Sequence, residues 1–154
     1  MFLRKVTKED AKILFDWAND PETRQNSFST EPIPWENHLS WLDGKLADEN
    51  CFFYIGMNEA GEALGTIRFD YQAEKESAVL SYSVAPKHRG NGYGAVLLSL
   101  GETQIAKEKG CLQIMAEVKT SNGASRKCFL KNGYQELETT EEEIVFGKMT
   151  GKSV

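Results

Sequence analysis

The residues best suited to chemistry lie where an apolar strand runs into a glycine-rich turn that opens a helix. Residues 89–94 read Arg-Gly-Asn-Gly-Tyr-Gly and follow the strand residues 81–85. Glycines tolerate positive φ angles, so several backbone N–H groups can crowd around one anion. The first N–H groups of a helix have no intrahelical acceptor and lie at the positive end of its dipole. This combination is suited to binding a pyrophosphate, with Arg89 as an additional cation.

The turn is accompanied by a second motif further along the chain. Residues 89–94 fit the pattern R/Q-x-x-G-x-G/A, and the turn resembles the coenzyme-binding turn of the GNAT family of N-acetyltransferases. Pro86 precedes it as in that family. The family's second motif resembles a set of residues downstream, namely Asn122, Ser125, Phe129, Gly133 and Tyr134. With both motifs present at the right separation, the chain is identified as a member over nearly its whole length.

The resemblance implies acetyl-CoA as co-substrate and assigns residues to it. The pantetheine arm would lie against the backbone near Ser83 and Val84, in the gap between two splayed strands. The helix after residue 121 would support that arm. The implied cofactor contacts are Ser83, Val84, Arg89, Gly90, Asn91, Gly92, Tyr93, Gly94, Asn122 and Ser125.

The acceptor site is expected between residues 17 and 41, where this fold builds it. Residues 17–24 and 33–41 resemble a subgroup that acetylates amino sugars carried on nucleotides. Asn37 stands where that subgroup has Glu. Arginines suit a diphosphate and aromatic rings suit a base or sugar face. The implied substrate contacts are Trp17, Asn19, Arg24, Trp35, His38 and Arg68.

An ammonium must lose a proton before it can attack a thioester, so the reaction needs a base. The sequence leaves several candidates for the base and for the acid. The strand 77–84 contains no carboxylate. The candidate bases are therefore a water chain polarised by Ser81, Ser83 or Tyr82, the carboxylate of Asp70, or His38, whose ordinary pKa is near neutral. On the acid side, relatives often carry Tyr where this chain has Phe129, which leaves Ser125 or water to assist the departing thiolate.

The elements that position these residues follow from the periodicity of apolar residues. We expect helices over residues 7–20, 35–46, 93–109 and 122–132, and an irregular segment over 22–34. We expect strands over 51–56, 63–71, 77–85, 112–118, 134–137 and 144–149. The fold class is α+β (mixed α/β): one domain over 1–154, with a mostly antiparallel sheet, a splayed parallel strand pair and flanking helices.

Composition narrows the choice of partners. The net charge of −5 argues against general nucleic-acid binding, which needs clustered cations. The three cysteines and two histidines lack ligand spacing, so we expect no metal site. No apolar run approaches the roughly 20 residues of a membrane span, and the N-terminus lacks a secretory signal. We expect a cytoplasmic monomer or homodimer without membrane attachment.

Two further interpretations of the sequence remain. One is a protein or peptide N-acetyltransferase, which would need an open groove instead of an aromatic pocket. The other is a non-catalytic regulatory domain that keeps the acyl-CoA site, since the motif tyrosine and the strand carboxylate are missing. The leading expectation is direct acetyl transfer to a primary amine in a ternary complex, with a nucleotide-linked amino sugar as acceptor.

Overall fold

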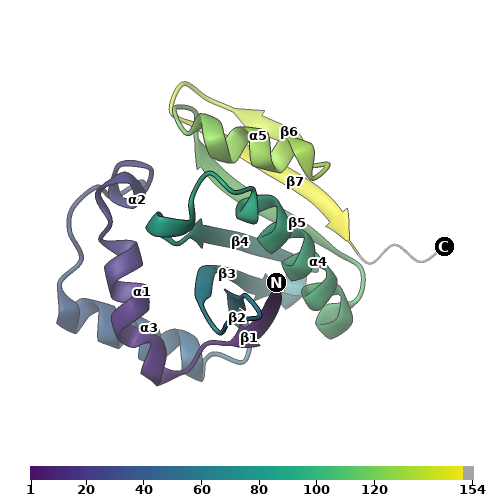
Figure 1. Cartoon of the computed structure of the whole chain (residues 1–154). Coiled ribbons are helices and arrows are strands. Elements are labelled where there is room, and N and C mark those ends of the chain that lie inside the picture. The colour runs from purple at the N-terminus through teal and green to yellow at the C-terminus, as the bar shows by residue number, and fades with distance from the viewer. Residues whose placement is uncertain (151–154) are drawn as a thin grey trace.

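The computed structural model describes residues 1–150, which are organised around one seven-stranded sheet (Figure 1). Its strand order is β1-β2-β3-β4-β5-β7-β6, and only β4 and β5 pair in parallel. The predicted mostly antiparallel sheet with one parallel pair is therefore confirmed. The strands are β1 (Phe2–Lys5), β2 (Cys51–Met57), β3 (Ala63–Gln72), β4 (Ser77–Val84), β5 (Leu112–Lys119), β6 (Gln135–Thr139) and β7 (Glu143–Thr150).

The parallel pair β4–β5 separates after a short contact. Residues 77–79 pair with residues 113–115, and no β4–β5 pairs follow. On its other side β4 stays paired with β3 as far as Val84. Residues 80–84 of β4 thus have one backbone edge turned toward β5 without a strand partner. Such an edge offers N–H and C=O groups to a bound molecule.

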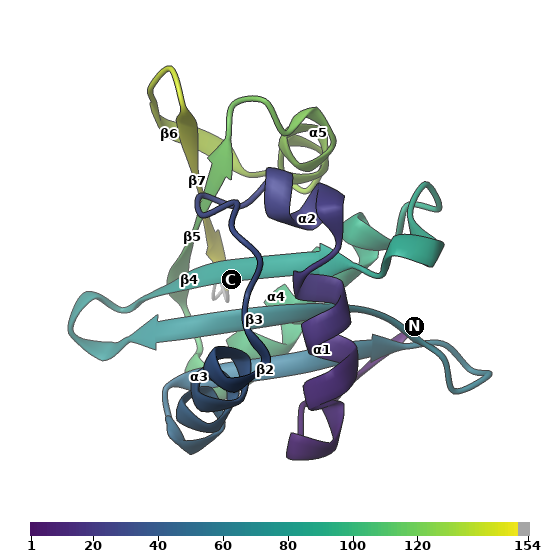
Figure 2. The ribbon, with the colours of Figure 1, turned by 90° about the vertical axis from the view of Figure 1, so that its left-hand side faces the viewer.

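The helices cover both faces of the sheet. On one face lie α1 (Ala11–Ala18), α2 (Pro21–Gln25) and α3 (Trp35–Ala47); in Figure 2, α1 and α3 lie in front of β2 to β4, and α2 lies above β4, near α5. On the other face lie α4 (Tyr93–Lys109) and α5 (Gly123–Lys131). Successive strand residues point to opposite faces. Accordingly Phe53 and Ile55 pack with α1 and α3, whereas Ile67 and Phe69 pack in the core that includes α4 and α5.

Two elements near the N-terminus were not predicted. Residues 2–5 form an edge strand, although they are short and half polar, because β2 supplies a pairing partner. Residues 21–25 form the helix α2, although the segment from residue 22 was expected to be irregular. The Asp20 carboxylate accepts a hydrogen bond from the Thr23 amide, and Pro21 occupies the first helical position. These are regular helix-start signals, and five residues are too few to produce an apolar period.

Asp10 joins β1 to the start of α1 through charged hydrogen bonds. Its carboxylate accepts bonds from Arg4 Nη1 and Nη2 at 2.9 and 2.8 Å and from the Thr7 amide at 2.8 Å. Asp10 is buried, so removing it leaves a guanidinium and an amide without their acceptor. The Asp10→Ala variant is expected to lose about 2–3 kcal/mol of unfolding free energy, or roughly 5–10 °C of Tm by thermal unfolding.

The control is Asp16→Ala, which removes an exposed i,i+4 pair with Lys12 and is expected to cost at most about 0.5 kcal/mol. The hydrogen bond from Arg4 is the main reason that the pKa of Asp10 is lowered. The stabilisation is therefore present above the unfolded-state pKa of about 4 and is lost as pH falls through the lower folded-state pKa. Equal Tm values for the two variants would contradict this role of Asp10.

Candidate functional site

The glycine turn lies at the edge of a cleft of about 920 Å³. After the short helical turn Pro86–His88, Gly90 and Gly92 adopt φ angles of +81° and +77°. Gly92 is the N-cap of α4, and no side-chain hydrogen bond caps this helix. The first amides of α4 therefore keep their donors available at the positive end of a 17-residue helix. The turn has the geometry of an anion site.

The cleft extends from this turn into the gap between β4 and β5. Its other walls are residues 79–84 of β4, 116–118 of β5 and the first turns of α5. The unpaired edge of β4 thus forms one long side of the cleft. A chain with an anionic end and an extended arm fits this shape. Of the expected cofactor contacts, these line it: Ser83, Val84, Arg89, Gly90, Gly92, Tyr93, Gly94, Asn122 and Ser125.

Asn91 is the one expected cofactor contact that does not line the cleft. Its Nδ2 donates to the His88 carbonyl at 3.1 Å, so the side chain holds the turn together from within.

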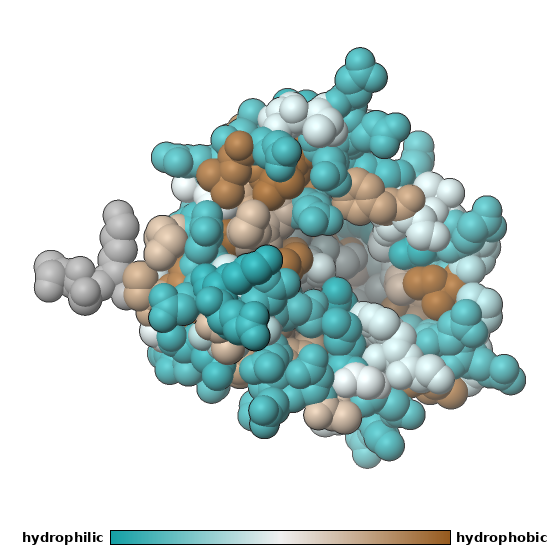
Figure 3. All heavy atoms as spheres, turned by 180° about the vertical axis from the view of Figure 1, so that it is seen from behind, coloured by the Kyte–Doolittle hydropathy of each residue, from teal (hydrophilic) through white to brown (hydrophobic). Residues whose placement is uncertain are grey.

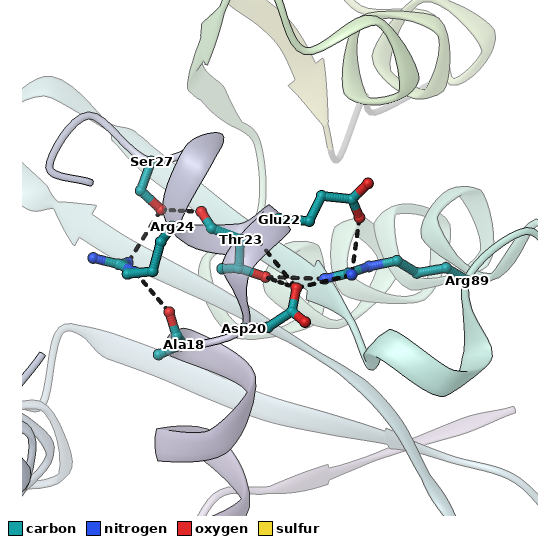
Figure 4. A network of polar contacts seen from close by, with 7 residues as sticks. All are labelled: Ala18, Asp20, Glu22, Thr23, Arg24, Ser27 and Arg89. Carbon is teal, nitrogen blue, oxygen red and sulfur yellow. Dashed lines mark hydrogen bonds and ion pairs between the residues drawn. The ribbon is translucent and has the colours of Figure 1, made fainter. Parts of the chain in front are cut away.

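Arg89 differs from expectation in the direction of its guanidinium. Its Nη1 lies 2.9 Å from Asp20 Oδ2 and 2.8 Å from Glu22 Oε2, and its Nη2 donates to Thr23 Oγ1 at 3.0 Å (Figure 4). The Arg89 guanidinium, which was expected beside the pyrophosphate, is thus bound by residues 20–23 at the start of α2.

A tyrosine hydroxyl lies at the start of α5. The Tyr82 hydroxyl is 2.9 Å from Ser125 Oγ, and the Ser125 amide donates to Asn122 Oδ1 at 3.2 Å. The Tyr82 ring meets the Phe129 ring edge to face at 5.5 Å. Burial is the main cause that raises the pKa of Tyr82, which favours the protonated hydroxyl. This shift disfavours Tyr82 as the base.

A second cavity of about 500 Å³ meets the first at β4. The residues that line both are Thr23, Ser27, Ser81, Tyr82 and Ser83. Aromatic side chains of Trp17, Trp41 and Phe53 form walls of the second cavity. Viewed from behind, the molecular surface is hollowed near its centre, within a largely hydrophilic rim (Figure 3). Two reactants held in these cavities would meet beside Tyr82.

The expected substrate contacts divide into two groups. Trp17, Arg24, His38 and Arg68 line the second cavity. Asn19 does not, because its side chain bonds the backbone of Ile33 in both directions at 2.7 and 3.0 Å. Trp35 also lies outside the lining: it packs edge to face on Phe15.

Trp41 and Phe53 line the second cavity but were not among the contacts expected from the sequence. Trp41 follows His38 by three positions on α3, which places both on one helix face. Phe53 lies on the strand face that turns toward α3, as the alternation along β2 indicates.

The two arginines of this cavity behave differently. Arg24 was expected at a diphosphate, but its guanidinium is occupied by the chain itself. It donates to the carbonyls of Ala18, Ser29 and Glu31 at 2.7, 3.0 and 3.2 Å. Arg68 donates from Nε to Asp70 at 3.0 Å and lies 5.0 Å over the Trp41 ring. Of the two, Arg68 is the cation that remains suited to an anionic ligand.

The two other base candidates, Asp70 and His38, also make contacts within the protein. Asp70 pairs with Lys45 at 2.8 Å as well as with Arg68. Burial would raise the pKa of Asp70, but the hydrogen bonds and charges of Lys45 and Arg68 outweigh it and lower the pKa. The buried His38 ring directs Nε2 to the Ala11 carbonyl at 2.9 Å. A carbonyl accepts only from a protonated ring nitrogen, so His38 holds α3 to α1.

Within residues 1–150, no group of three or more His, Cys, Asp or Glu side chains is arranged to hold a metal ion. Nor does any helix in this range have the length and apolar character to cross a bilayer.

Comparisons with known proteins agree with this geometry. A family model described as an acetyltransferase (GNAT) domain matches residues 1–135. The uncharacterized N-acetyltransferase YoaA of Bacillus subtilis (strain 168) is 29% identical over 140 residues, which cover 88% of this chain and 79% of that protein.

Solved structures share the fold at low sequence identity. Spermidine N-acetyltransferase from Vibrio cholerae, in complex with CoA and spermine, superposes with a TM-score of 0.86 at 14% identity, covering 97% of this chain and 95% of that one. The aminoglycoside acetyltransferase AAC(6')-Ib in complex with coenzyme A superposes at 0.78 with 18% identity, covering 96% and 93%. At these identities the likeness concerns the fold.

Proposed function

Because this chain belongs to the GNAT family and is an acetyl-CoA-dependent N-acetyltransferase, we propose that its acceptor is a small primary amine that also carries a negative charge. A nucleotide-linked amino sugar is the leading candidate. In this proposal residues 1–154 act as one domain, and acetyl passes directly to the amine in a ternary complex.

The observation that carries the proposal is the junction of the two cavities at Ser81, Tyr82 and Ser83. The cleft of the glycine turn suits coenzyme A, because α4 has uncapped amides for the pyrophosphate and β4 has an open edge for the pantetheine arm. When bound there, acetyl-CoA would supply the acetyl group as a thioester. The second cavity would hold the amine close to the thioester. Holding the two reactants together makes the reaction effectively intramolecular, which lowers its barrier.

The lining of the acceptor cavity supports an anionic acceptor. Among the described residues, no Asp or Glu lines this cavity, whereas Arg68 does. A polyamine would leave its several positive charges without counter-ions in such a site. Aromatic walls at Trp41 and Phe53 suit a sugar face or a base, and the Arg68 guanidinium suits a phosphate or carboxylate.

The residues at the junction suit proton transfer through solvent. Burial keeps the Tyr82 hydroxyl protonated, two cations hold Asp70, and the hydrogen bond to Ala11 fixes the buried His38 ring, so we place the base elsewhere. We therefore assign amine deprotonation to water held by the Ser81 and Ser83 hydroxyls. Tyr82 and Ser125 form a short donor chain beside Phe129, and we assign to it the hydrogen bond to the departing thiolate. A thiol pKa of about 8.5 makes this assistance useful but not essential.

The Tyr82→Phe variant tests the donor chain. It removes the hydroxyl and keeps the ring packed on Phe129, so the fold should be retained. We expect kcat to fall roughly 10- to 100-fold, less than for the loss of an oxyanion-hole donor because a thiolate leaves readily, with little change in coenzyme A affinity. Tyr71→Phe, on β3 and outside both cavities, is the matched control. Unchanged kcat in Tyr82→Phe would remove Tyr82 from the mechanism.

The substrate class is tested by thiol release from acetyl-CoA over a panel of amines. The panel contains a nucleotide-linked amino sugar, a phosphorylated amino sugar, spermidine, an aminoglycoside and a peptide with a free amine. We expect turnover of the anionic amines. Turnover of spermidine or the peptide alone would overturn the proposal, and tight coenzyme binding without any thiol release would favour a non-catalytic domain.

A further inference from the structure

The helix α2 forms a wall between the two cavities, yet no apolar side chain holds it in place. Thr23 and Ser27 line both cavities. No residue of α2 is buried. Hydrophobic packing therefore contributes little to its position, and polar contacts must determine where this wall stands.

Arg24 makes the α2 segment stiff within itself. Besides its three bonds to backbone carbonyls, its Nη2 donates to Ser27 Oγ at 3.1 Å, and that hydroxyl donates to the Thr23 carbonyl at 2.6 Å (Figure 4). These bonds join residues 18 to 31 across the helix and the loop after it. The segment should therefore shift as one piece if its outer contacts are lost.

The outer contacts come from both sides of the coenzyme cleft. From the end of β5, Lys119 Nζ donates to the Gln25 carbonyl at 2.9 Å. From the glycine turn, Arg89 binds Asp20, Glu22 and Thr23, as Figure 4 shows. The side chains of Asp20 and Arg89 are 17% and 30% exposed, so this pair is less screened than a surface ion pair. Burial would raise the pKa of Asp20, but hydrogen bonds from Arg89 and the Thr23 amide lower it overall.

We propose that Arg89 is a positioning residue for the acceptor cavity: it holds α2 against the coenzyme turn through Asp20, and it does not itself bind the pyrophosphate. The backbone amides of residues 90–94 remain free for that anion while the guanidinium is occupied. The coenzyme turn and the acceptor wall are thus one connected unit. The catalytic part of this inference rests on the proposed function.

The test compares Arg89→Gln and Asp20→Asn. Asparagine is as good an N-cap as aspartate, so Asp20→Asn removes the ion pair while the cap to Thr23 is retained. Lys87→Gln is the matched control, because Lys87 is an exposed cation on the same turn whose described ion pair, with Glu62, spans 3.8 Å. Three experiments are made: amide hydrogen exchange of residues 21–31, calorimetry for the Kd of coenzyme A, and steady-state kinetics for KM and kcat with the amine found in the panel.

Both variants are expected to raise the exchange rate of residues 21–31 about tenfold, since local opening becomes easier. They should raise the acceptor KM by about tenfold with little change in kcat, because the lost contact is with a binding wall. The Kd of coenzyme A should change by less than about twofold, and the double variant should be no worse than either single one, because both remove the same contact. Lys87→Gln should resemble the unmodified protein in all three.

One pattern would overturn the inference: Arg89→Gln weakens coenzyme A binding tenfold or more while Asp20→Asn does not, and exchange of residues 21–31 stays unchanged. That pattern would make Arg89 a phosphate ligand. If no amine is turned over, the proposed function fails, but exchange and coenzyme binding still decide the role of Arg89.

Discussion

Replacing Gly92 by glutamate is expected to weaken coenzyme A binding at least about 100-fold, the largest effect that we predict for a single change. Gly92 has a φ angle of +77°, which a side chain tolerates poorly. Apart from Gly92 itself and its two chain neighbours, no residue has an atom within 4 Å of where the Cβ would be, so the new side chain has room to reach the cleft. Its carboxylate would accept hydrogen bonds from the backbone amides at the start of α4, and its negative charge would repel the pyrophosphate.

The control for this variant is Gly61→Glu in the turn between β2 and β3. Gly61 has a φ angle of +83° and equally open surroundings. Gly61→Glu therefore adds the same backbone strain and the same negative charge at a place outside the cleft. Calorimetric titration with coenzyme A should show wild-type affinity for Gly61→Glu and no measurable heat for Gly92→Glu. Thermal unfolding of both variants is the check that they are folded. Retained binding in Gly92→Glu would remove the anion site from the glycine turn.

Replacing Arg68 by glutamine is expected to raise the acceptor KM by roughly 10- to 100-fold. This range corresponds to a charged hydrogen bond of about 1.5–3 kcal/mol between the guanidinium and an anionic group of the amine. The effect should be confined to anionic acceptors, and a neutral analogue should be used equally by both proteins. Steady-state kinetics with the two acceptors measures this difference.

The matched control is Lys45→Gln. Lys45 and Arg68 both pair with Asp70, at 2.8 and 3.0 Å, so each variant removes one of its cations. Only Arg68 lines the acceptor cavity. If the two variants raise KM equally, the effect comes from the loss of a cation beside Asp70, and Arg68 does not bind the anionic group of the acceptor. If Arg68→Gln lowers KM, the acceptor is a cation.

Local signals explain why the glycine turn was predictable from the sequence. Gly90 and Gly92 carry the positive φ angles, and α4 begins at Tyr93, as the pattern of glycines and apolar residues predicted. The separation of β4 from β5 followed from the family resemblance, and its extent was visible only once the pairing of residues 77–79 with 113–115 was known.

Long-range contacts explain what was missed. Arg89 and Arg24 were expected at phosphates, but their partners depend on a helix, α2, that is too short to show periodicity. Asp20 and Arg89 are far apart in sequence, and nothing local indicates that they meet. The same holds for Tyr82 and Ser125, which were both candidates, although their hydrogen bond was not foreseeable.

The most direct test of the coenzyme site follows backbone amide NMR signals during titration with coenzyme A and, separately, with pantetheine, which lacks the pyrophosphate. We predict that coenzyme A shifts the amides of residues 90–94 together with those of Ser83 and Val84, whereas pantetheine shifts only the latter two. Binding of coenzyme A that leaves the amides of residues 90–94 unmoved would contradict the pyrophosphate site at this turn.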